Sequence, residues 1–209
     1  MAPAVKICGL KTLEAVQAAK GADYYGFVVF PRSPRNISPE NAAKLKVHTS
    51  GKTVAVTVNA GDDLLQEIVS KFRPDYVQLH GDETPERVAE VKKKFPVSVI
   101  KALPVRIAKD INLTARFEDI ADMLMFDAKP SGDLPGGNGI PFDWTLLAGK
   151  KFKKPYFLSG GINIANVEKA LRESGAWMID ISSGLESSSG NKDPQMIADF
   201  IKKVKAISI

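Results

Sequence analysis

The chain has very little cysteine and no long apolar stretch. Cys8 is the only cysteine among 209 residues. No disulfide can therefore form within the chain, and we expect a reducing compartment. No apolar run approaches the ~20 residues of a membrane-spanning helix, and the first residues lack the basic and apolar regions of a signal peptide. We therefore expect a cytoplasmic protein that does not associate with a membrane.

Metal-binding and dinucleotide-binding patterns are also missing. The histidines, His48 and His80, are far apart, and Cys8 has no second cysteine near it, so we expect no metal site. No G-x-G-x-x-G motif follows the first expected strand. The net charge is +5, but the lysines form short runs without interleaved aromatic residues. That pattern favours solvated helix faces over a nucleic-acid surface, and it suits a small anionic substrate.

What the chain does contain is a regular alternation of short apolar runs and helix-like segments. The runs expected to form strands are 5–8, 24–30, 53–59, 76–80, 97–102, 123–127, 155–159 and 177–181. The helix-like segments are 12–20, 38–46, 62–72, 84–95, 106–117, 142–148, 164–174 and 193–207. This alternation predicts an α/β fold with a single domain, 1–209, built as a parallel eight-stranded (β/α)8 TIM barrel. A doubly wound open sheet is the structural alternative.

A barrel of this kind carries its chemistry where the strands end. Ionisable residues do gather at the ends of the expected strands: Cys8, Arg35 with Arg32 nearby, His80, Asp127 and Asp180. Two glycine-containing turns, 159–161 and 182–184, follow the last two strands and predict a phosphate site made of backbone N–H groups. The segment 129–139 has four glycines and two prolines, which predicts a substrate lid.

Each of these residues also has a purely structural explanation. Cys8 alone could be a small buried core residue. Arg35 could be a solvated loop residue, and Asp127 could cap the next loop. Considered together, Cys8 and Asp127 could act as a base and an acid across a bound ligand. A thiol base needs thiolate character, which Lys6 could promote, although neighbours along a strand point to opposite faces.

Six stretches in order span nearly the whole chain: 6–10, 26–38, 78–83, Asp127 with 136–144, 159–162 and 180–186. Their sequences include KICGL, SPRNIS, QLHGDE, GGNG, SGGI and DISSGLE. Together they resemble the phosphoribosylanthranilate isomerase family of tryptophan biosynthesis. Two positions depart from the family pattern, with Asn138 in place of Ser or Thr and Leu185 in place of Val.

The resemblance implies an isomerase that needs no cofactor. Members of the family are small (β/α)8 barrels that convert N-(5-phosphoribosyl)anthranilate to 1-(2-carboxyphenylamino)-1-deoxyribulose 5-phosphate by an Amadori rearrangement. By this resemblance, Asp127 would be the general acid that opens the ribose ring, and Cys8 would be the general base that removes the C2′ proton. Arg35 would hold the anthranilate carboxylate.

The same resemblance assigns the remaining site residues. His80 and Asp180 would line the site. Backbone amides of the two turns would hold the phosphate, at Gly160, Gly161, Ser183 and Gly184. The partner would be a small anionic sugar phosphate, and the sequence leaves open a monomer or a homodimer.

Other functions fit these residues less well. A histidine-pathway phosphoribosyl isomerase would use a pair of carboxylates, and an indole-glycerol-phosphate synthase would use a Lys–Glu set, so the Cys8 and Asp127 pair argues against both. A phosphate binder without catalysis would have no need of Cys8. A redox sensor would need a second, resolving cysteine.

Overall fold

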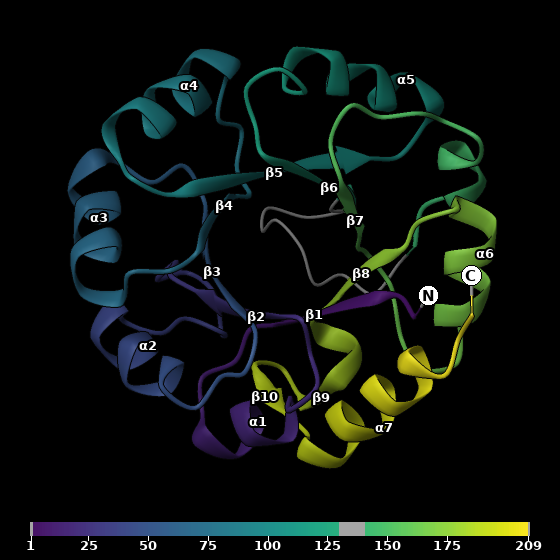
Figure 1. Ribbon diagram of the computed structural model, residues 1–209, viewed down its shortest axis with the longest axis horizontal. Helices are drawn as coiled ribbons and strands as arrows, with labels where there is room; N and C mark the ends of the chain where they lie inside the picture. The colour runs from purple at the N-terminus through teal and green to yellow at the C-terminus, as the bar shows by residue number, and fades with distance from the viewer. Residues whose placement is uncertain (1, 130–140, 209) are drawn as a thin grey trace.

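Eight parallel strands close into a barrel in the computed structural model, which describes residues 2–129 and 141–208 (Figure 1). The strands are β1 Ala4–Cys8, β2 Tyr24–Val28, β3 Lys52–Thr57, β4 Tyr76–Leu79, β5 Ser98–Val105, β6 Met123–Ala128, β7 Tyr156–Leu158 and β8 Met178–Ile181. Strand β8 returns to β1, with Met178 beside Ala4. The predicted parallel (β/α)8 barrel is therefore confirmed, and the open sheet is excluded.

The helices form a ring outside the strands (Figure 1). They are α1 Leu13–Ala18, α2 Pro39–Lys46, α3 Asp62–Glu67, α4 Pro85–Lys94, α5 Ala108–Ile111, α6 Val167–Ser174 and α7 Pro194–Lys205. Proline in the first turn and a capping side chain before it start α2, α4 and α7, with Ser38, Thr84 and Asp193 each accepting a bond from a backbone N–H. None of the helices in the described ranges is long and apolar enough to span a membrane.

Alternating residues of each strand pack into two separate cores. On β6, Met123 and Met125 face the barrel interior, whereas Leu124 and Phe126 pack with the outer core against the helices. Side chains two residues apart on a strand share a face, so Asp127 continues the inward series at the end of β6. The same alternation sends Cys8 inward at the end of β1 and Asp180 inward on β8.

Three expected helices differ from the prediction. Segment 142–148 forms only a 3-10 turn, Trp144–Leu147, because the backbone leaves helical geometry on both sides of it, with ψ 102° at Asp143 and ψ 128° at Ala148. Segment 106–117 divides into α5 and a 3-10 turn, Asn112–Arg116, where the Thr114 hydroxyl donates to the Ile111 carbonyl. Segment 62–72 begins as α3 and widens into a π-helix over Ile68–Phe72.

A short hairpin after β8 was not expected from the sequence. Its strands are β9 Glu186–Ser188 and β10 Asn191–Lys192, and they pair antiparallel. Strands of two or three residues carry no readable periodicity, which explains why the sequence pattern did not predict them.

Leu185, one of the two departures from the family pattern, is buried in the outer core. The other, Asn138, and the predicted lid beyond Lys129 lie outside the described residues.

Candidate active site

A cavity of about 250 Å³ lies at the C-terminal ends of the barrel strands. Most of the predicted site residues line it: Cys8, Arg35, His80, Asp127, Gly160, Gly161, Asp180 and Ser183. Gly184 instead packs behind the lining, where a Cβ would lie 2.2 Å from the Ile162 carbonyl oxygen. Arg32, the alternative to Arg35, is exposed and does not line the cavity.

Cys8 shares the barrel interior with a buried ion pair. The Lys6 side chain is fully buried, and its Nζ donates to Asp180 Oδ1 at 2.7 Å. Ser159 Oγ donates to the other Asp180 oxygen at 2.9 Å. A Cβ at Gly26 on the neighbouring strand would lie 3.0 Å from Cys8 Sγ and 3.1 Å from Lys6 Nζ. The glycine therefore leaves the space that both groups occupy.

The placement of Lys6 corrects the argument that strand alternation separates it from Cys8. The two residues are two positions apart, so their side chains leave the same face of β1. Burial raises the pKa of the Cys8 thiol, and the Lys6 ammonium opposes that rise by favouring the thiolate. Burial also disfavours the charge on Lys6, but Asp180 and Cys8 outweigh it and raise the pKa of Lys6. Lys6 is therefore charged beside the thiol.

Asp127 is held by a chain of hydrogen bonds from β4. The Gln78 amide nitrogen lies 2.6 Å from His80 Nδ1, and His80 Nε2 lies 3.0 Å from Asp127 Oδ2. Because the amide nitrogen is a donor, Nδ1 accepts, and the imidazole proton sits on Nε2 and is donated to Asp127. Asp127 Oδ1 lies on the side of Gly160, where a Cβ would be 2.9 Å away. One carboxyl oxygen is thus anchored, and the other remains for a ligand.

The turn after β7 has the backbone geometry of an anion site. Gly160 and Gly161 have φ of +87° and +68°, a region that residues with side chains rarely adopt. A Cβ at Gly160 would also lie 2.4 Å from the Ala128 backbone nitrogen. Within 2–129 and 141–208, no protein acceptor bonds to the N–H groups of these two glycines. Such N–H groups, next to Ser183 in the second turn, can bind phosphate oxygens.

Arg35 reaches the cavity from the loop after β2, and its guanidinium is already paired. Its Nε and Nη2 donate to the two Glu186 carboxylate oxygens at 2.6 and 2.9 Å. The remaining donors of the guanidinium are available to a second carboxylate.

Among the described residues, no group of three or more His, Cys, Asp and Glu side chains is arranged to hold a metal ion.

Comparison with known proteins identifies the family. The family model of N-(5'-phosphoribosyl)anthranilate (PRA) isomerase matches residues 5–203, nearly the whole chain. The chain belongs to this family. The PRA isomerases of Brucella canis and Brucella abortus are each 50% identical to it over 98% of this chain and 95% of their own length.

Solved PRA isomerases share the barrel. The Thermotoga maritima enzyme superposes with a TM-score of 0.87 at 32% identity, covering 98% of this chain and all of that one. A second PRA isomerase structure, in complex with reduced 1-(o-carboxyphenylamino)-1-deoxyribulose 5-phosphate, has a TM-score of 0.84 at 31% identity and the same coverage. The fold and the family inferred from the motifs are both confirmed.

Some residues of this candidate site had no role in the sequence prediction. Gln78 is a fully buried polar residue in an apolar strand, and that break in the pattern was the available signal. Lys192 has no such signal, because it lies in a hairpin that the sequence did not predict. Glu186 was part of a matched motif, but its contact with Arg35 joins positions 151 residues apart.

Proposed function

We propose that the protein converts N-(5'-phosphoribosyl)anthranilate to 1-(2-carboxyphenylamino)-1-deoxyribulose 5-phosphate. The observation that carries this proposal is the joint placement of Cys8 and Asp127 at one cavity that Arg35 and residues of the two glycine turns also line. The substrate has a carboxylate at one end and a phosphate at the other. An arginine and a set of backbone N–H groups match those two ends.

In the first step, Asp127 acts as the general acid. Its Oδ1 gives a proton to the ribose ring oxygen while the bond from that oxygen to C1′ breaks. The anthranilate nitrogen supplies its lone pair to C1′, which gives an open-chain iminium. The His80 Nε2–H bond to Oδ2 keeps the carboxyl oriented and stabilises the carboxylate that the step leaves.

In the second step, Cys8 acts as the general base. Its thiolate removes the proton from C2′, and the electrons of that bond neutralise the iminium to give an enol amine. Tautomerisation of the enol then gives the ketone, so the overall formula is unchanged and the step needs no oxidant or cofactor. Burial makes the thiolate a strong base, and the Lys6 charge helps it to form.

A fluorescence assay with the purified protein tests the activity. We expect freshly made phosphoribosylanthranilate to be consumed faster than in a matched sample of the double variant Cys8→Ser/Asp127→Asn. A protein that binds the substrate but leaves its fluorescence unchanged would instead be a non-catalytic binder. Identical rates in the two samples would remove Cys8 and Asp127 from the mechanism.

The setting of the reaction follows from the same proposal. The substrate is a free anionic sugar phosphate, so neither a nucleic acid nor a membrane takes part, and we place the reaction in the cytoplasm. We leave the oligomeric state as a monomer or a homodimer, because all of the assigned side chains come from one chain. Light scattering of the purified protein distinguishes the two.

A further inference from the structure

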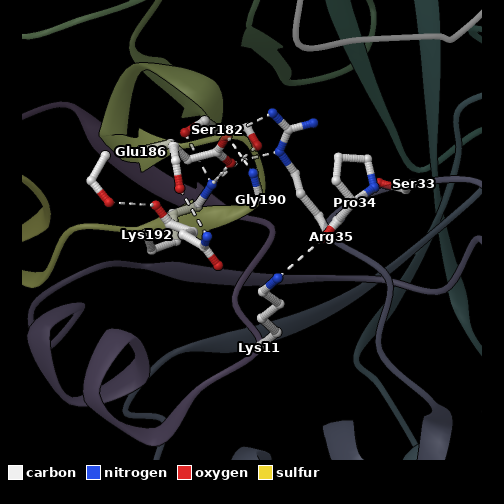
Figure 2. Close-up of polar contacts among 11 residues, drawn as sticks. Lys11, Ser33, Pro34, Arg35, Ser182, Glu186, Gly190 and Lys192 are labelled. Carbon is white, nitrogen blue, oxygen red and sulfur yellow. Dashed lines mark hydrogen bonds and ion pairs between the residues drawn. The ribbon is translucent and has the colours of Figure 1, made fainter.

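The guanidinium of Arg35 is held by a residue of the hairpin after β8. Glu186 meets it fork to fork, with both carboxylate oxygens accepting from Arg35 (Figure 2). The Glu186 side chain is only 5% exposed. Two parallel charge-assisted bonds fix the plane of a guanidinium as well as its position. Arg35 therefore presents its free donors in one defined direction.

Lys192, on the other strand of the hairpin, binds the same carboxylate. Its Nζ donates to Glu186 Oε1 at 2.5 Å and to the Ser182 carbonyl oxygen at 3.1 Å. The Lys192 side chain is 2% exposed. Ser182 is the first residue of the second turn that we assign to phosphate. One carboxylate is thus connected to the Arg35 guanidinium directly and to the phosphate turn through Lys192.

Close backbone contacts hold this cluster in place. Gly190 donates its N–H to Glu186 Oε2 at 3.1 Å, and a Cβ there would lie 2.5 Å from the Pro34 carbonyl oxygen. A Cβ at Gly9 would lie 2.8 Å from Arg35 Cδ. The arginine stem therefore crosses directly over the turn that follows Cys8. Figure 2 shows Glu186 between Arg35 and Lys192, and Lys11 bonded to the Pro34 carbonyl below them.

The geometry points to a positioning role for Glu186 and Lys192. They set the separation between the carboxylate-binding guanidinium and the phosphate-binding turn, and so select a substrate whose two anionic groups match that separation. This role rests on the proposed function. Two cationic side chains share one carboxylate here, although burial lowers the pKa of Lys192. An arginine fixed before binding loses less conformational freedom when the substrate arrives.

A double-mutant cycle between Glu186 and Arg35 tests the first half of the role. We expect Glu186→Gln to raise KM for phosphoribosylanthranilate about tenfold while kcat changes less than about threefold, because the freed arginine must be ordered at each binding event. In an Arg35→Met background the same substitution should change KM by less than about twofold, because contacting residues are not additive. Equal effects in both backgrounds would overturn the role.

Inorganic phosphate tests the second half. Lys192→Met leaves the Arg35–Glu186 pair in place but releases Ser182, so we expect competitive inhibition by phosphate to weaken at least about threefold. An unchanged inhibition constant would remove Lys192 from the role. Glu186→Gln could fail to fold, because it leaves Lys192 buried without a partner. In that case the double variant Glu186→Gln/Lys192→Met removes the buried charge. Lys192→Met then replaces the wild type as the reference protein of the double-mutant cycle.

A matched control and the wild-type protein complete the design. Glu168 pairs with Arg172 at 2.9 Å on α6, where both side chains are about half exposed. Glu168→Gln removes the same kind of contact at a residue that does not line the cavity, and it should leave KM unchanged. If the wild-type protein consumes the substrate but the effects of Glu186→Gln and Arg35→Met on KM are additive, only the positioning role is overturned. Wild-type protein that does not consume it overturns the proposed function as well.

Discussion

At Cys8, burial and a neighbouring ammonium act in opposite directions on one thiol. Burial raises the pKa of Cys8, and the Lys6 charge counteracts part of that effect. A base with a raised pKa is less often ionised but takes a proton more strongly once it is. Lys6 is in turn kept charged by Asp180, at 2.7 Å. Lys6 on β1 and Asp180 on β8 therefore both act on the sulfur, and the positive charge of Lys192 on β10 also favours the thiolate.

Single substitutions of the proposed acid and base should separate chemistry from binding. We expect Cys8→Ser and Asp127→Asn each to lower kcat by about 10³-fold, since a positioned acid or base typically contributes 10²- to 10⁴-fold. Steady-state kinetics and circular dichroism measure activity and fold together. Both variants should still bind the product in calorimetry. A variant with normal turnover would show that its residue does not transfer a proton.

The lowered pKa of Glu186 predicts how the free energy of unfolding changes with pH. Burial disfavours its charge, but Arg35 and Lys192 outweigh that and lower the pKa of Glu186 to about 2, from an ordinary 4.5. A lowered carboxyl pKa stabilises the fold above pH 4.5 and ceases to do so as the pH falls toward 2. Urea unfolding should show wild type more stable than Glu186→Gln by on the order of 3 kcal/mol at pH 7.

The decisive measurement is how that difference changes with acid. It should shrink steadily as the pH is lowered from 4.5, because wild-type Glu186 then becomes protonated and resembles the amide. A difference that stays constant from pH 7 to pH 3 would mean that the Glu186 charge does not stabilise the fold.

At the scale of elements, the turns after β7 and β8 are built against each other. Gly184 sits where a Cβ would lie 2.2 Å from the Ile162 carbonyl oxygen, so any side chain there pushes the second turn away from the first. We expect Gly184→Ala to raise KM at least about tenfold with a smaller effect on kcat, since displaced N–H groups no longer converge on the phosphate.

Gly61 provides the control for that substitution. It has φ −75°, and a Cβ there would meet nothing within 4 Å. Gly61→Ala should therefore leave both KM and stability close to wild type. An unchanged KM in Gly184→Ala, measured beside this control, would argue against a phosphate site at the second turn.

The sequence predicted the short elements less well than the long ones. Residues 142–148 carry an apolar pattern typical of a helix, but the chain forms only one 3-10 turn before Gly149. The hairpin β9–β10 has strands of three and two residues. Elements of this length depend on contacts with distant parts of the chain more than on local propensity.

At the scale of the molecule, the net charge and the cavity both favour an anionic ligand. The chain carries +5, and Arg35, a cationic side chain, lines the cavity. An anionic substrate should therefore feel an attraction that salt screens. We expect KM to rise at least about twofold between low and 0.5 M potassium chloride, with kcat nearly constant.

Chloride is the appropriate salt, because phosphate or sulfate would compete directly for the proposed anion site. The melting temperature, followed across the same range, shows whether the fold itself responds to salt. A KM that is independent of ionic strength would mean that substrate capture relies on short-range contacts alone.

The sequence by itself determined the barrel, the family and the residues at the strand ends. The eightfold alternation of strand and helix is local information, and the inward direction of Asp127 follows from its spacing after Met123 and Met125. These features depend on residues that are near one another along the chain, which is why the sequence displays them.

Only the tertiary structure decided which side chains meet. The barrel brings Lys6 to Asp180 and Arg35 to Glu186, across 174 and 151 positions, and no periodicity reports such contacts. It also showed that Gly26, on the neighbouring strand, leaves room for the side chains of both Lys6 and Cys8. The charges around the proposed base and around the arginine are thus set by closing β8 onto β1, since that closure alone makes distant residues neighbours.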